Sequence, residues 1–127
     1  MDAIGVGTEI VECLRVGRMI EQHAESFLLR VFTEREIRFC QSRKRAVEHF
    51  AAHWAAKEAV LKALGRPWRR GVELTDVEID EQPGSPPEVR LRGTTAELAE
   101  GIGLVRVMLT MAHCRAYATA TAIALKG

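Results

Sequence analysis

The sequence has few cysteines, and their pattern excludes two classes of protein. Cys13, Cys40 and Cys114 are an odd number of thiols, and no two of them have the close spacing of a metal-binding motif. A small secreted domain would instead carry an even set joined by disulfide bonds. We therefore expect reduced, partly buried thiols in a cytoplasmic protein.

Long apolar runs and an excess of one charge are also absent. No segment approaches the roughly 18 apolar residues that span a bilayer, and the N-terminus carries Asp2 without the basic region of a signal peptide. A formal net charge of +1 lacks the broad positive footprint of a nucleic-acid-binding protein. These absences predict a cytoplasmic chain whose partners are neither membranes nor nucleic acids.

What the sequence contains fits one soluble domain. Its 127 residues are 47% hydrophobic and 28% charged, which is the balance of a globular protein. We expect a single domain over residues 1–127. A chain of this length buries only a modest core, and association between copies of the chain would enlarge the buried area.

The order of the predicted elements indicates an α+β fold, with an antiparallel sheet packed against one long helix and shorter helices. Val77 and Ile79 alternate with charged residues, as in a half-exposed strand, and Thr94 or Thr95 is expected to cap a short helix. The predicted elements are a strand at 3–11, helices at 12–21, 34–41 and 45–64, strands at 76–80 and 88–92, a helix to residue 100, and a hairpin of strands at 104–112 and 116–125.

Local sequence signals mark the ends of two helices and a place where another backbone or a ligand can approach the first strand closely. Thr33 and Glu36 have the spacing of a capping box, which starts the helix at 34–41. The long helix at 45–64 has no internal glycine or proline and ends at a glycine. Gly5 and Gly7 allow another backbone or a ligand to approach the first strand closely.

Two carboxylates occupy apolar surroundings. Glu58 shares the apolar stripe of the long helix, where a free charge is costly to bury, so it pairs with Lys62 or Lys57, stays neutral, or binds a cation. Glu9 interrupts the first strand, where it either faces water at a sheet edge or acts with Glu58. Two carboxylates without softer ligands nearby suit Mg²⁺. His113, at the tip of the last hairpin, is by itself typical of a surface residue.

Three motifs in this order resemble the bacterial holo-acyl-carrier-protein synthase family of 4′-phosphopantetheinyl transferases. Residues 5–12, Gly-Val-Gly-Thr-Glu-Ile-Val-Glu, are similar to its opening Gly-x-Gly-x-Asp signature. Residues 54–65, Trp-Ala-Ala-Lys-Glu-Ala-Val-Leu-Lys-Ala-Leu-Gly, are similar to its central signature, which is the most specific of the three. Residues 110–113, Thr-Met-Ala-His, fall where the family has Ser-x-[Ser/Thr]-His. The resemblance covers essentially the whole chain.

The resemblance implies an enzyme that transfers 4′-phosphopantetheine from coenzyme A to a serine of an apo-acyl carrier protein. The serine hydroxyl attacks the β-phosphorus, adenosine 3′,5′-bisphosphate leaves, and Mg²⁺ neutralises the charge on the pyrophosphate. A carboxylate or a metal-bound water takes the hydroxyl proton, and the sequence does not choose between them. The implied site consists of Glu9 and Glu58 as metal ligands, Glu58 and Lys62 as catalytic residues, and Lys57, Lys62, Gly65, Arg66 and His113 as contacts of coenzyme A.

Three of these assignments are more specific. On the resemblance, Lys57 contacts phosphate or pairs with Glu58, and His113 lies near the 3′-phosphate of coenzyme A. Gly65, which closes the long helix, would lie against the nucleotide.

The family likeness also implies partners. It implies a homotrimer with active sites between subunits. Arg15 matches an arginine of the family's first helix that holds acidic residues of the carrier protein, and Arg18 and Arg30 would extend that surface. Arginines there raise the association rate more than the affinity. The carrier protein would serve fatty-acid or polyketide synthesis, between which the sequence does not choose.

Four positions depart from the family pattern. The metal-binding aspartate is Glu9, one methylene longer, so we expect a higher Mg²⁺ requirement because Mg²⁺ is strict about geometry. His53 stands in place of an arginine, Ala112 in place of a hydroxyl residue, and Gly-Arg-Pro at 65–67 in place of a Gly-Thr-Gly loop. These departures motivate an alternative, a catalytically weakened relative that binds coenzyme A or the carrier protein.

Overall fold

The computed structural model describes residues 1–66 and 71–127, and it confirms the α+β fold. Pro67, in the loop that departs from the family pattern, lies outside the described residues. The strands are β1 (Asp2–Glu12), β2 (Val77–Asp80), β3 (Glu88–Leu91), β4 (Leu104–His113) and β5 (Tyr117–Lys126), and the helices are α1 (Cys13–Val31), α2 (Glu34–Gln41), α3 (Ala46–Ala63), α4 (Gly93–Gly101) and the short 3-10 helix η1 (Leu74–Asp76).

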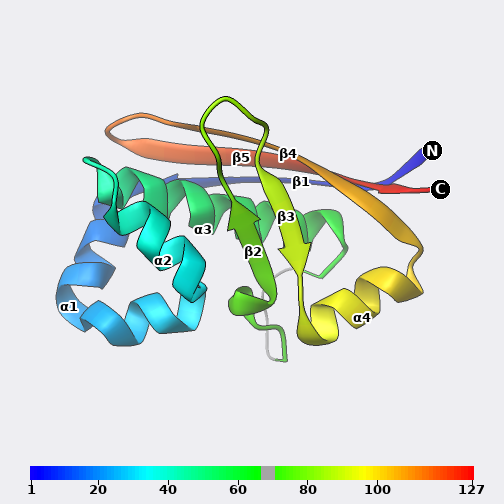
Figure 1. The fold of residues 1–127 in the computed structure, drawn as a ribbon, viewed down its shortest axis with the longest axis horizontal. Helices are drawn as coiled ribbons and strands as arrows, with labels where there is room; N and C mark the ends of the chain where they lie inside the picture. Colours follow the sequence, from blue (N-terminus) through cyan, green and yellow to red (C-terminus); the bar gives the residue numbers. More distant parts are fainter. Residues whose placement is uncertain (67–70) are drawn as a thin grey trace.

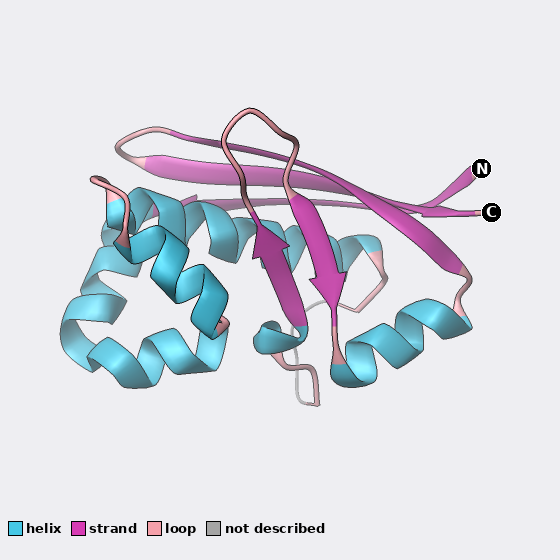
Figure 2. Cartoon of the chain, in the orientation of Figure 1, coloured by secondary structure: helices cyan, strands magenta, loops and turns pink. Residues whose placement is uncertain are grey.

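The long strands form one antiparallel sheet in the order β1-β5-β4, and β2 pairs with β3 in a separate hairpin. Figure 1 shows α3 lying along one face of the larger sheet, with α1 and α2 at one end and α4 at the other. Both chain termini emerge at the end of the sheet that is remote from α1, as Figure 2 also shows. Among the described helices, none is long and apolar enough to cross a membrane.

Small residues let α3 lie very close to the sheet. A Cβ added at Gly5 would lie 1.8 Å from the carbonyl oxygen of Ala63, and one added at Gly7 would lie 2.0 Å from that of Ala59. Glycine alone fits this separation, so the predicted close approach is that of a helix backbone. On β5 the alternate buried residues also carry only a methyl group: Ala118, Ala120, Ala122 and Ala124.

The ends of α2 and α3 follow the sequence signals. Thr33 and Glu36 form the predicted capping box, with each side chain bonded to the other residue's backbone amide. At the end of α3, Gly65 has a φ of +74°. The amides of Gly65 and Arg66 donate back to the carbonyls of Lys62 and Leu61, at 2.9 and 2.8 Å. This closing pattern requires a left-handed residue, which glycine supplies without strain.

Two helix predictions need correction. The helix at 12–21 is only the first part of α1, which continues to Val31 across a kink at Ala24, where φ is 44°. The predicted cap of α4 is also wrong, because the helix begins at Gly93 after Arg92, which makes no side-chain cap bond. The hydroxyls of Thr94 and Thr95 donate to Asp76 instead, at 3.4 and 3.3 Å.

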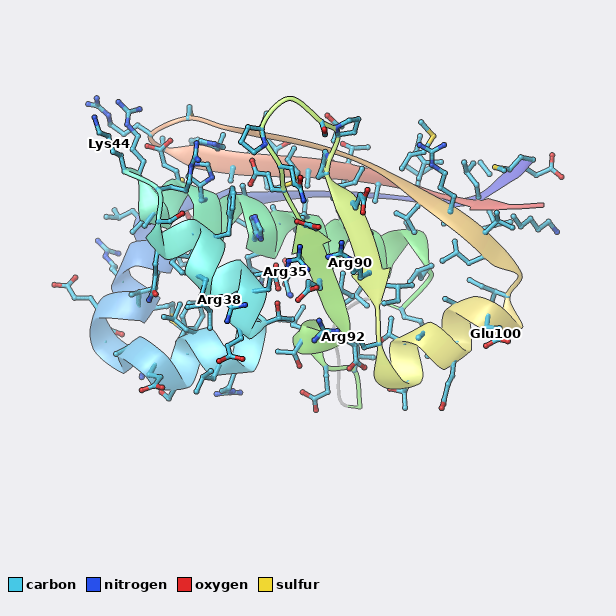
Figure 3. The ribbon with its side chains drawn as sticks, in the orientation of Figure 1. Arg35, Arg38, Lys44, Arg90, Arg92 and Glu100 are labelled. Carbon is cyan, nitrogen blue, oxygen red and sulfur yellow. The ribbon has the colours of Figure 1, made fainter. Side chains whose placement is uncertain are left out.

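The prediction that β2 is half exposed is also wrong, because all four of its residues are buried. Glu78 accepts a hydrogen bond from the Thr33 hydroxyl at 2.6 Å and pairs with Arg92 at 2.9 Å. Asp80 pairs with Arg90 at 2.7 Å and with Arg35 at 3.4 Å. Figure 3 shows the side chains of Arg35, Arg90 and Arg92 gathered beside β2. Buried carboxylates are tolerated here because each one is paired.

Candidate active site

The close contact between β1 and α3 brings three of the predicted site residues together. Glu9 lies on the same side of β1 as Gly7, towards the helix, and its side chain is only 22% exposed. The ammonium of Lys62 lies 2.9 Å from the Glu9 carboxylate and donates to the carbonyl oxygen of Thr8 at 3.1 Å. Glu58, one helical turn before Lys62, hydrogen-bonds with Glu9.

The two carboxylates differ in protonation. Burial raises the pKa of Glu58, and the neighbouring Glu9 carboxylate raises it further, to about 7. Burial also acts to raise the pKa of Glu9, but bonds from Lys62, the Ile10 amide and Glu58 outweigh it, and the pKa is lowered. Below about pH 7 a protonated Glu58 therefore donates to an ionised Glu9, because two close carboxylates do not ionise independently.

Neither a salt bridge between Glu58 and a lysine nor exposure of Glu9 to water describes the arrangement. Within residues 1–66 and 71–127, Glu58 makes no ion pair, since Lys62 pairs with Glu9 and Lys57 pairs with Glu36. Glu9 lies on an edge strand, as expected, but its carboxylate faces α3 rather than water.

The carboxylate pair fits a hard divalent cation. Burial and the neighbouring Glu9 carboxylate both raise the pKa of Glu58, and a cation bound between the two carboxylates would offset both effects. No group of three or more His, Cys, Asp or Glu gathers as ligands in the described part of the chain. Two carboxylate oxygens completed by water and phosphate oxygens are the usual protein contribution to a Mg²⁺ site.

The assignment of Lys57 to coenzyme A is corrected by its surroundings. Its side chain is fully buried, and its ammonium donates to Glu36 at 2.5 Å and to the carbonyl oxygen of Val77. Burial lowers the pKa of Lys57, although Glu36 opposes the shift. An ammonium held in this way contacts neither Glu58 nor a phosphate arriving from solvent. Its role in this structure is to connect α3 to α2 and β2.

Gly65 shares a hollow with Lys62, the residue that pairs with Glu9. Gly65 and Lys62 line one hollow of about 320 Å³ together with Gly5 and Val6. No atom lies within 4 Å of the Cβ position of Gly65, so the space above its backbone is open. Arg66 follows directly and is partly exposed.

His113 lies far from the carboxylate pair within one chain. It is the last residue of β4, and its Nδ1 lies 2.9 Å from the carboxylate of Glu48 near the start of α3. Glu48 precedes Glu58 by ten helical residues, which is about 15 Å along the helix axis. The structure therefore brings Glu9, Glu58, Lys62 and the end of α3 together, but it does not bring His113 to them.

The three arginines predicted to hold a carrier protein line two different hollows. Arg15 and Arg30 line a pocket of about 230 Å³ whose apolar lining includes Phe27 and Trp54. The guanidinium of Arg15 lies over the Trp54 ring, 5.7 Å from its centre. Arg18 lines a separate, open groove between α1 and the start of α3.

Sequence reasoning missed a buried charge network between α2 and α3. His53 is fully buried, with Nδ1 2.9 Å from Glu36 and Nε2 3.1 Å from Glu81. Glu36 was identified only as a capping residue and His53 only as a departure from the family pattern. The available signal was that both fall on helix positions where a polar side chain faces the core.

Comparisons with known proteins agree with the sequence motifs. The model of the 4′-phosphopantetheinyl transferase superfamily matches residues 5–122. The holo-[acyl-carrier-protein] synthase of Rhodopirellula baltica is 48% identical over 120 residues, covering 94% of this chain and 95% of that protein. The corresponding protein of Koribacter versatilis is 42% identical over 120 residues, covering 94% of this chain and 96% of that protein.

The fold of this chain is also similar to solved structures of holo-[acyl-carrier-protein] synthases. The holo-[acyl-carrier-protein] synthase of Neisseria meningitidis matches with a TM-score of 0.88 at 28% identity, covering 98% of this chain and all of that one. The ACPS–CoA complex of Chronobacterium ammoniagenes matches with a TM-score of 0.83 at 30% identity, covering 99% of each chain. From β1 to β5, this chain belongs to the 4′-phosphopantetheinyl transferase superfamily and, within it, to the holo-[acyl-carrier-protein] synthases.

Proposed function

We propose that this chain transfers 4′-phosphopantetheine from coenzyme A to a serine of an apo-acyl carrier protein, releasing adenosine 3′,5′-bisphosphate with the help of Mg²⁺. The observation that carries the proposal is the Glu9–Glu58 pair with Lys62 beside it. All three residues fall within the first two of the three family motifs, and the fold brings the three side chains together.

Each residue has a role that follows from its place. Glu9 and Glu58 would hold the Mg²⁺, which when bound supplies positive charge to the pyrophosphate. Lys62 is 43% exposed and lies beside the pair, so its ammonium can contact a phosphate oxygen and offset the charge that develops as the leaving group departs. The open backbone at Gly65 leaves room for the nucleotide next to Lys62, and Arg66 extends that positively charged edge.

The carrier protein would dock at α1. Arg15 and Arg30 stand at a pocket with an aromatic lining, a combination that suits an acidic protein with an apolar anchor residue. Arg18 lies on the same helix but lines the neighbouring groove, so we place it at the rim of the docking surface.

A homotrimer would explain two features. The face of the sheet opposite α3 exposes apolar side chains, among them Val6 at 65%, Ile10 at 62% and Met108 at 47%, and such patches mark contact surfaces. The 3′-phosphate and the pyrophosphate of coenzyme A are attached to one ribose. His113 and Glu58 are too far apart in one chain to contact both, so residues from two chains would complete one site. The three free cysteines support a cytoplasmic location.

The alternative, a binding module without turnover, is less well supported. His53 is buried in a network away from the carboxylate pair, so that departure from the family pattern affects packing rather than chemistry. Glu58 and Lys62, which the chemistry needs most, are both present.

The deciding experiment mixes the protein with coenzyme A, Mg²⁺ and an apo-carrier protein and follows the mass of the carrier protein. We expect addition of phosphopantetheine by the wild type, loss of turnover in Glu58→Gln, and normal turnover in the matched control Glu100→Gln on α4. Binding of coenzyme A without any mass change, across several carrier proteins, would favour the binding module.

A further inference from the structure

A buried carboxylate outside the three sequence motifs holds His113. Glu48, in the first turn of α3, is only 7% exposed, and its Oε1 lies 2.9 Å from His113 Nδ1. The other carboxylate oxygen, Oε2, lies 3.8 Å from the Arg45 guanidinium. The ring of His49 packs edge-on against that of His113, with the centres 4.8 Å apart and the planes at 62°. The imidazole is thus fixed from two sides.

The acceptor at Nδ1 determines which nitrogen is free. A carboxylate only accepts hydrogen bonds when ionised, so Nδ1 must carry a proton to make the bond. The bond therefore fixes both the ring orientation and the proton at Nδ1, and Nε2 is the atom left to contact a ligand.

The groove beside Glu48, the residue that holds this imidazole, is positively charged. Glu48 lines an open groove of about 780 Å³ with Lys44 and Arg45 from the turn before α3, Arg115 from the β4–β5 turn and Arg18 from α1. Figure 3 shows Lys44 projecting at this end of the molecule, beside the β4–β5 turn. The acids at the groove are Glu48 itself and Glu21. A doubly charged phosphate monoester suits such an environment.

We propose that Glu48 is a positioning residue for His113, and that through it the enzyme distinguishes coenzyme A from its 3′-dephospho form. This inference rests on the proposed function, which assigns His113 to the 3′-phosphate. Glu48 does not touch the substrate. It acts by holding one nitrogen of the ring so that the other faces the phosphate.

The first test reads the ring itself. Nitrogen-15 NMR of the wild-type protein without substrate should show His113 with its proton on Nδ1. In Glu48→Met, which keeps the length of the side chain but removes the acceptor, this preference should disappear. In Glu48→Gln, whose amide oxygen can still accept, it should be retained. A wild-type ring with the proton on Nε2 and a bare Nδ1 would overturn the proposal without any variant.

The second test separates the 3′-phosphate from the rest of the reaction. We expect the wild type to prefer coenzyme A to 3′-dephospho-coenzyme A. Glu48→Met should lose about tenfold of that preference through a higher KM for coenzyme A, the usual size of one lost hydrogen bond, with kcat and the dephospho substrate unaffected. Glu48→Gln should restore most of the preference, and Glu100→Met on α4 should behave as the wild type.

The outcomes distinguish the two proposals. Absence of transfer by the wild type with either substrate would defeat the proposed function. Transfer with an intact preference for coenzyme A in Glu48→Met, or an equal loss for both substrates, would defeat the positioning role alone. Adding Glu48→Met to His113→Ala should cause no further loss, because the two residues act as one unit.

Discussion

At the scale of single residues, the protonation of Glu58 depends on its neighbours. The side chain is half buried on a helix that faces the sheet, and an ionised Glu9 lies beside it. In the absence of other positive charge, protonation of Glu58 removes the repulsion between the two carboxylates. A divalent cation bound between them would remove the same repulsion, so the proton and the cation compete for one carboxylate.

Metal binding should therefore release protons. Because the pKa of Glu58 is raised to about 7, the carboxyl is protonated below that pH, and affinity for Mg²⁺ should rise as pH increases through neutrality. Calorimetric titration in two buffers of different ionisation enthalpy measures the effect, and near pH 7 we expect release of about half a proton. Glu58→Gln should release none, and a wild type that binds Mg²⁺ equally well below and above pH 7 would contradict this competition.

His53 faces a carboxylate with each ring nitrogen, in a position where the family has an arginine. An imidazole donates from both nitrogens only when it is doubly protonated, and here both face carboxylates. Burial acts to lower the pKa of His53, but the bonds with Glu36 and Glu81 outweigh it and the pKa is raised above 6.5.

The stability that His53 contributes should depend on pH. Because its pKa is higher in the folded state, the contribution is complete below the unfolded value of 6.5 and is lost as pH rises through the folded value. The free energy of unfolding in urea should therefore differ most between the wild type and His53→Gln in mildly acidic buffer, and less in alkaline buffer. The exposed His23→Gln is the control, and a difference that grows with pH would show that His53 is neutral in the folded protein.

At the scale of elements, the sequence located the ends of α2 and α3, although it misplaced the cap of α4, and it did not reveal the partners of the buried charges. The ends of α3 and the capping box of α2 depend on residues within one or two turns, so the sequence suffices to find them. The burial of Glu78 in β2 depends on Arg92 across the hairpin and on Thr33, 45 residues earlier. Lys57 likewise pairs 21 residues back along the chain. Spacing cannot reveal such partners, and the family resemblance misassigned Lys57 for the same reason.

The close packing of β1 against α3 should not tolerate one added methyl group. In Gly7→Ala the new Cβ would lie 2.0 Å from the Ala59 carbonyl oxygen and 2.8 Å from the Ala63 nitrogen, both backbone atoms that cannot move aside alone. We expect a loss of about 3 kcal/mol in the free energy of unfolding. Mg²⁺ affinity should also fall, because the helix must retreat from Glu9.

The matched control for Gly7→Ala is Gly101→Ala at the end of α4, where no atom lies within 4 Å of the added methyl. Its stability should stay within about 0.5 kcal/mol of the wild type. If both variants unfold alike, the contact between β1 and α3 does not set the stability.

At the scale of the whole molecule, the sheet has two very different faces. One face is covered by α3. The other presents a row of three threonines in register, Thr8, Thr121 and Thr110, beside a row of Val6, Ile123 and Met108. Such a surface is flat and only weakly polar, which suits contact with copies of itself.

Subunit complementation tests whether two chains build one site. Glu58→Gln and His113→Ala, each tested alone at low coenzyme A, should be impaired. Co-refolding equal amounts should restore part of the activity, since after random mixing about a quarter of all sites would combine an intact Glu58 with an intact His113. Light scattering should show a trimer for the wild type and dissociation in Ile10→Glu, with Leu98→Glu on α4 as the control. An active monomer, or mixtures no better than their components, would contradict shared sites.

One carboxylate, that of Glu36, accepts from the Thr33 amide at 3.0 Å and from Lys57 at 2.5 Å, and it faces His53 at 2.9 Å. An eight-residue peripheral helix such as α2 would ordinarily open on its own, long before the rest of the protein. Here its departure would leave the buried ammonium of Lys57 without its ion-pair partner and the buried ring of His53 with Glu81 alone. The amide hydrogens of α2 should therefore exchange with deuterated solvent as slowly as those of α3, so that the two helices open together as one cooperative unit.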